Sequence, residues 1–296
     1  MPFIGEFAAL ATAFCWSGSS MAFTAASERI GSMQVNINRM ILGSILLALT
    51  ILLMNLNYNI SSTQVKYLVI SGFVGFVIGD SFLFKAFQLI GARLGMLLMS
   101  LVPAFSTVMG YFFLNEFLQV WGILGIIVTL FGIALVILDK KPNPTSKYKL
   151  TKTGVIYGVM GALGQASGLI FAKLAFADGQ INGFVATFVR LTSAIIIFCP
   201  LALLAGRYKN PVKLYSKNIK ALWFTLTGTV FGPFLGVTAS LIAISNTKVG
   251  IASTIMATVP VLMLPLVVLI YKEKLNWRSV VGAVLAVAGV AILFLR

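Results

Sequence analysis

The sequence predicts an all-α integral membrane protein of about ten transmembrane helices, arranged as two inverted repeats of five helices. Apolar residues make up 59% of the 296 residues, and charged residues only 10%. A soluble domain carries about 25% charged residues, so a chain this apolar must face lipid or lipid-embedded helices. The apolar residues also fall into separate runs of about 20, the length that crosses a bilayer. Finally, several motifs recur at matched spacing in the two halves of the chain.

The apolar runs define the expected helices and their connections. They cover residues 4–26, 35–54, 67–88, 92–114, 119–138, 154–176, 183–205, 219–243, 249–270 and 277–295. Two connections, 139–153 and 206–218, are longer and basic, and the first contains Pro142 and Pro144. We therefore expect a first repeat over 1–139, a basic linker over 140–153 and a second repeat over 154–296.

The two halves share a pattern of proline, glutamate and glycine. The four positions of the first half are separated by the same intervals as those of the second: Pro103, Glu116, Gly125 and Gly132, then Pro260, Glu273, Gly282 and Gly289. Mid-helix proline kinks a helix, so the two prolines are expected hinges at the repeat interface. The glutamates lie in turns, where we expect them to cap helices, and the glycines allow close helix packing. Five helices per repeat give the halves opposite orientations in the membrane.

The duplicated pattern resembles a known family. Small residues, a helix with a central proline, a turn with glutamate and a Gly-x6-Gly helix occur in 91–136 and again in 246–294. This arrangement is similar to the EamA-type branch of the drug/metabolite transporter superfamily, and the resemblance covers nearly the whole chain. It implies secondary transport of metabolites, often export, by alternating access around a central cavity.

The net charge of +15 comes from 22 basic and 7 acidic residues. The basic residues lie mostly between apolar runs and form no periodic face, so they indicate topology rather than nucleic-acid binding. Their distribution predicts that loops 139–153 and 206–218 are cytoplasmic and that both termini lie outside. The family resemblance implies cytoplasmic termini instead, and both orientations stay open.

Charged residues at membrane depth are costly and usually face a cavity or a partner. Arg39, with Asn36 on its helix face, and Arg190 match each other in the two halves and are candidates for binding an anionic group. The alternative for both arginines is snorkelling to the headgroups. Asp80 is the acidic residue well inside a run, and it either forms a structural pair with Arg39 or another basic residue, or carries a coupling proton.

Two further residues complete the candidate substrate-binding set. Gln165 lies in the middle of the sixth run and can hydrogen-bond a substrate or another helix. Trp16 lies at similar depth in the first run, where it lines a cavity or packs in the core. The second half has no acid equivalent to Asp80, whose aligned position is expected near Pro233.

The sequence excludes several kinds of chemistry. It has no histidine, which removes imidazole catalysis and histidine metal sites, and no Walker A motif for ATP. We therefore expect no catalytic residues, cofactor or metal, and no direct use of ATP. The favoured function is secondary transport of a small organic metabolite, such as an amino acid or a related anionic or zwitterionic solute. The alternatives are efflux of drugs or lipophilic cations, and a multispanning membrane enzyme. The expected partners are the solute and the bilayer of the cell membrane. The energy source is a proton gradient, which makes protons a further partner, or exchange, or the solute's own gradient.

Overall fold

The computed structural model describes residues 3–138, 151–263 and 277–294, and the described parts consist of helices joined by short connections. The first half contains α1 (Ile4–Ile30), α2 (Ser32–Leu53), α3 (Ser62–Gly72), the π-helix η1 (Phe73–Gly79), α4 (Asp80–Met99), α5 (Val102–Leu114) and α6 (Val120–Leu138). The second contains α7 (Lys152–Ala177), α8 (Gly183–Leu204), α9 (Pro211–Lys217), α10 (Ile219–Thr229), η2 (Val230–Gly236), α11 (Val237–Asn246), α12 (Val249–Met256) and α14 (Trp277–Phe294).

The helix boundaries confirm the internal repeat. Helix α8 begins and ends 151 residues after α2, so Arg39 and Arg190 occupy the same position in the two halves. The two π-helices are 157 residues apart at both ends, and α4 and α11 follow them directly. The equivalent of Asp80 is therefore Val237. The sequence alignment that placed it near Pro233 was wrong, because the connection 205–218 after α8 is longer than the connection 54–61 after α2, which shifts the register of all the helices that follow.

The described residues contain five helical stretches long and apolar enough to cross a membrane: 32–53, 62–91, 152–177, 183–204 and 219–246. Shorter apolar helices cover 102–114, 120–135, 249–263 and 280–292. The chain is thus an all-helical membrane protein with two similar halves. Most of the linker 140–153, the end of the ninth run and Glu273 lie outside the described residues.

The fourth and ninth runs are broken helices rather than kinked ones. The helix is interrupted by turns at residues 100–101 and at 257–258. Pro103 follows the first turn within the first two positions of α5, and Pro260 follows the second turn. The prediction of mid-helix prolines was therefore wrong. At the start of a helix the missing N–H of proline costs nothing, so the prolines favour a new helix after each break.

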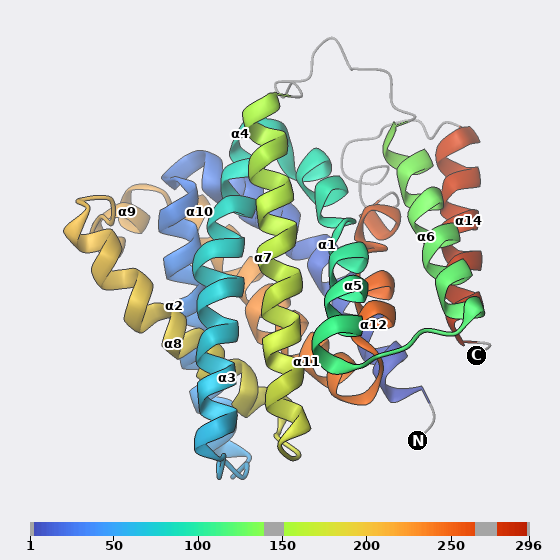
Figure 1. Cartoon of the computed structure of the whole chain (residues 1–296). Helices are drawn as coiled ribbons and strands as arrows, with labels where there is room; N and C mark the ends of the chain where they lie inside the picture. Colours follow the sequence, from blue (N-terminus) through green and yellow to red (C-terminus); the bar gives the residue numbers. More distant parts are fainter. Residues whose placement is uncertain (1–2, 139–150, 264–276, 295–296) are drawn as a thin grey trace.

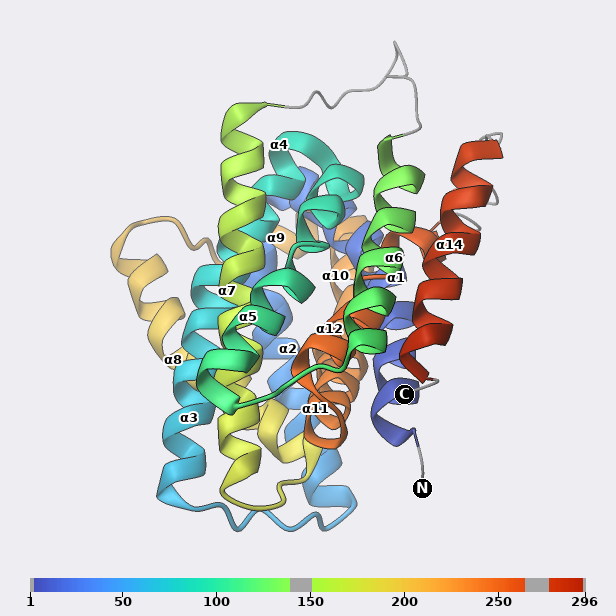
Figure 2. The ribbon, with the colours of Figure 1, turned by 45° about the vertical axis from the view of Figure 1, so that its right-hand side comes forward.

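Each half contributes its first helix to the other half. Helix α1 packs against α10, η2 and α11, and α7 packs reciprocally against α3, η1, α4 and α5. Helix α2 lies against α8, and α6 lies beside α14 at the edge of the molecule (Figures 1 and 2). The start of α1 and the end of α14 lie toward the same end of the molecule in both views.

Glycines bring helix backbones into direct contact, as their matched spacing in the sequence predicts. A Cβ atom on Gly132 of α6 would lie 2.4 Å from the backbone nitrogen of Ala286, and one on Gly289 of α14 would lie 2.5 Å from that of Thr129. Each helix thus presents a glycine to the backbone of the other, because the two helices are equivalent members of the repeat. Small residues of this kind allow the backbones of membrane helices to approach closely.

Glu116 ties the two halves together at one end, and its expected role as a helix cap is confirmed. Its Oε2 accepts a hydrogen bond of 2.7 Å from the backbone N–H of Val249, the first residue of α12. Its Oε1 lies 3.8 Å from Nζ of Lys173, which also donates to the backbone oxygen of Thr247 at 3.1 Å. The carboxylate thus compensates the N–H groups at the start of a helix from the opposite half.

The crossing of α7 and η1 generates a prediction about stability. A Cβ atom on Gly164 would lie 2.6 Å from Cα of Gly79, so Gly164→Ala should force the two backbones apart. Overpacking of this kind costs about 1–3 kcal/mol. We expect a lower thermal midpoint of the purified protein. The control is Gly18→Ala in α1, where a Cβ atom meets nothing within 4 Å. Equal midpoints for the two variants would contradict this account of the crossing.

Candidate functional site

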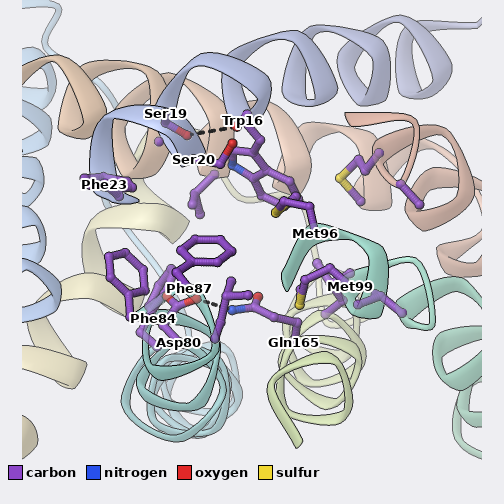
Figure 3. Close-up of a pocket in the computed structure, with 18 of the residues that line it drawn as sticks. Trp16, Ser19, Ser20, Phe23, Asp80, Phe84, Phe87, Met96, Met99 and Gln165 are labelled. Atoms are coloured by element: carbon purple, nitrogen blue, oxygen red, sulfur yellow. Dashed lines mark hydrogen bonds between the residues drawn. The ribbon is translucent and has the colours of Figure 1, made fainter. Parts of the chain in front are cut away.

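A cavity of about 100 Å³ lies between the two halves. The residues that line it come from both halves: Trp16, Ser19, Ser20, Phe23, Arg39, Phe76, Asp80, Leu83, Phe84, Phe87, Met96, Met99, Val102, Gln165, Leu169, Gly232, Val237, Ser253, Met256 and Ala257. Figure 3 shows Asp80 and Gln165 on one wall, with Trp16 and Ser20 on the helix opposite.

A buried ion pair forms the polar part of this wall. Asp80 Oδ2 pairs with Arg39 Nη2, and both side chains are 6% exposed. The other carboxylate oxygen, Oδ1, accepts a hydrogen bond of 2.5 Å from Gln165 Nε2 (Figure 3). The three side chains come from α4, α2 and α7, so this cluster of three residues connects the two halves. Burial of an unpaired carboxylate is unfavourable, and here each oxygen has a donor.

A second set of contacts fixes the orientation of Arg39. Asn36 Oδ1 accepts hydrogen bonds from Arg39 Nε at 3.1 Å and Nη2 at 3.0 Å, and Asn36 Nδ2 donates to the backbone oxygen of Phe76 at 3.3 Å. The guanidinium carbon lies 4.6 Å from the ring centre of Phe84 and 5.3 Å from that of Phe23. The aromatic rings stabilise the cation while excluding water from it.

The π-helix η1 places Asp80 at the cavity. The backbone N–H of Asp80 donates to the oxygen of Gly75, five residues earlier, and Gln165 Nε2 donates to the same oxygen at 3.3 Å. A π-helical turn is wider than an α-turn and is frequently found at functional sites. The second half repeats the backbone arrangement, since the N–H of Val237 donates to the oxygen of Gly232. The two halves share this geometry, but only the first carries a carboxylate there.

The cavity therefore has a small charged patch within a mainly apolar lining. A Cβ atom on Gly79 would lie 3.1 Å from the backbone nitrogen of Gln165, and one on Gly236 would lie 2.6 Å from Trp16 Nε1. The two glycines are equivalent. Trp16 of α1 therefore packs against the second half at the position where Gln165 of α7 packs against the first. Val237 likewise replaces Asp80. Phenylalanine, leucine, methionine and valine make up most of the remaining lining.

Four of the six residues expected to bind substrate line the cavity: Arg39, Asp80, Gln165 and Trp16. Asn36 lies outside the lining and supports Arg39. Arg190 is also outside the lining. It is 2% exposed, with its guanidinium carbon 4.7 Å from the ring centre of Phe76.

The two expected hinge prolines, Pro103 and Pro260, do not line the cavity, but the breaks that precede them border it. Met99 and Val102 flank the first break, and Met256 and Ala257 lie at the second. The cavity is therefore bounded by broken helices at equivalent positions of the two repeats.

Sequence reasoning missed the aromatic lining. Leu83, Phe84 and Phe87 follow Asp80 at spacings of three, four and seven residues along α4, and all of them line the cavity. Residues at these spacings share one face of a helix. Applied from Asp80, this spacing would have predicted that the three residues face the cavity.

Two interlocked halves around a central cavity, bordered by broken helices, form the arrangement expected of a membrane transporter. Residues 3–138 and 152–295 each match the family model described as the EamA-like transporter family. The chain belongs to this family, within the drug/metabolite transporter superfamily, and is a transporter rather than an enzyme.

A solved structure supports the fold alone. The chain whose title reads "Crystal structure of protein" superposes with a TM-score of 0.76 at 16% sequence identity. The match covers 99% of the present chain and 96% of that chain. No curated protein matches the sequence.

The buried pair generates a prediction about stability. Asp80→Asn removes the negative charge beside Arg39, and breaking a buried pair from one side costs about 3–5 kcal/mol. We expect a large fall in the thermal midpoint of the purified protein, partly recovered in the double variant Asp80→Leu with Arg39→Met. Asp178→Asn, at an exposed position beyond α7, should leave the midpoint unchanged. A midpoint for Asp80→Asn equal to wild type would show that the pair does not support the fold.

Proposed function

We propose that the protein exports a small zwitterionic solute, of the amino-acid type with a large apolar side chain, across the cell membrane. The observation that carries the proposal is the composition of the cavity wall. It presents a carboxylate and a guanidinium side by side, next to an aromatic and thioether surface.

The polar side matches the two ends of a zwitterion. The ammonium group of the solute would pair with Asp80 and the carboxylate with the planar fork of Arg39. Gln165 already donates to Asp80 and can reorient toward the solute. In this scheme the internal ion pair is exchanged for two ion pairs with the solute, so neither buried charge is left without a partner.

The apolar side would hold the side chain of the solute. Phe84, Phe87, Met96 and Met99 line the cavity beside Asp80, and Met256 contributes from the second half (Figure 3). Burial of a large apolar side chain contributes about 1.5–3 kcal/mol. Methionine adapts its shape to different apolar groups, which favours several related solutes over a single one.

The breaks at 100–101 and 257–258 support alternating access. A helix interrupted next to a cavity can change its local direction without disrupting packing elsewhere, and Pro103 and Pro260 mark the start of the moving segments. Protonation of Asp80 would weaken its hold on Arg39, which makes this carboxylate the candidate for proton coupling. The outward direction rests on the family resemblance.

A second candidate function is efflux of lipophilic cations. Asp80 offers a carboxylate within a cavity lined by phenylalanine and methionine, the surface that an aromatic cation would contact. Arg39 opposes this assignment, because a cation bound to Asp80 would leave the arginine uncompensated.

Thermal stabilisation of the purified protein separates these functions. Leucine and phenylalanine should raise the midpoint, whereas their amides, their N-acetyl derivatives and tetraphenylphosphonium should not. Gln165→Leu should weaken the response about ten- to a hundredfold in concentration, since a hydrogen bond to a charged group contributes roughly 1.5–3 kcal/mol. Gln88→Leu, which removes a bond to the Ser27 backbone oxygen outside the cavity, is the matched control. Stabilisation by tetraphenylphosphonium alone would favour cation efflux and contradict the zwitterion.

A further inference from the structure

We propose that Arg190 is a second partner for Asp80, and that the carboxylate moves from Arg39 to Arg190 when the empty transporter changes its facing state. Arg190 would then be a positioning residue that acts through Asp80 and does not touch the solute. The inference rests on alternating access within the proposed function, but not on the identity of the solute.

Arg190 is a buried cation whose hydrogen bonding is incomplete. It is 2% exposed, and its Nε has no hydrogen-bond partner among the residues that the structure describes. A Cβ atom on Gly75 would lie 3.2 Å from Arg190 Nη2, so the guanidinium rests against the backbone of η1. The ring of Phe76 compensates part of the lost hydration by a cation–π contact. A buried charge in this condition is unfavourable, and a carboxylate partner would offset that cost.

The carboxylate that can satisfy Arg190 is close by. Asp80 interacts electrostatically with both arginines, with Arg39 contributing more than Arg190. The ring of Phe76 lies within cation–π distance of both, 5.9 Å from the guanidinium carbon of Arg39 and 4.7 Å from that of Arg190. Asp80 therefore has two cations within reach of its field, and in this structure it is hydrogen-bonded to one of them.

The repeat gives a reason for the exchange. Arg39 and Arg190 occupy equivalent positions on α2 and α8, which lie against each other. The equivalent of Asp80 is Val237, so one carboxylate serves two equivalent arginines. Alternating access in such folds is largely a rocking of one repeat or helix bundle against the other around a fixed site. Arg39 and Asp80 belong to the first half and Arg190 to the second, so this motion changes the distance from Asp80 to Arg190 and can bring the two into contact.

The test measures the facing equilibrium without any solute. A reporter cysteine at Ser19, which lines the cavity, is placed in a background with Cys15→Ser and Cys199→Ser. Its alkylation rate with a membrane-impermeant maleimide is measured in right-side-out and inverted vesicles, and the ratio of rates reports the equilibrium. Arg190→Gln should shift this ratio about tenfold in one direction, and Arg39→Gln should shift it in the opposite direction.

Two further variants keep the test decisive. Arg190→Lys retains the charge but loses the fork, so it should shift the ratio in the direction of Arg190→Gln by less. It also serves as the deciding variant if Arg190→Gln does not fold. Lys85→Gln, which removes an exposed cation from α4, should leave the ratio unchanged.

Three results would overturn the proposal. Shifts of the two arginine variants in the same direction, or no shift in either, would show that Arg190 is a static part of the packing. An unchanged ratio together with weaker stabilisation by leucine or phenylalanine would show instead that Arg190 contacts the solute. Because the ratio is measured without solute, a failure of the zwitterion assignment leaves this test intact.

Discussion

The structure depends on one buried ion pair, between Arg39 and Asp80. A carboxylate at this depth is tolerated only when both oxygens have donors, and the donors here come from α2 and α7. Satisfying Asp80 therefore requires the two halves of the chain to be assembled. Arg190 is also buried, outside the cavity lining, and adds a second positive charge near the pair.

Close backbone contact makes this pair possible. Gln165 reaches Asp80 because Gly164 of α7 approaches Gly79 of η1 without any side chain between them. The π-helical turn then directs Asp80 toward the cavity. Polar chemistry and glycine packing are consequently a single constraint: a side chain on either glycine would move the amide away from the carboxylate as well as strain the helices.

The parts of the fold that depend on hydropathy and repetition could be predicted from the sequence. The boundaries of α2 and α8 and the equivalence of Arg39 and Arg190 follow from apolar length and matched spacing. The breaks at 100–101 and 257–258 could not, because hydropathy is the same for a continuous and an interrupted apolar helix. The equivalent of Asp80 was displaced because the connection 205–218 of the second half is longer than its counterpart 54–61, and hydropathy does not align connections. The position of Arg190 along its helix was readable, but the face that it presents depends on packing against Phe76, which no sequence period reports.

The exchange of first helices between the halves has a consequence for biosynthesis. Helix α1 finds its partners α10 and α11 about 190 residues later in the chain. At roughly 5–20 residues per second, the ribosome needs about 10–40 s to supply them. During that interval the serines and threonines buried along α1, among them Thr12, Ser17 and Ser20, lack the surroundings that they have in the finished protein. The nascent first half therefore stays incomplete until translation nears its end.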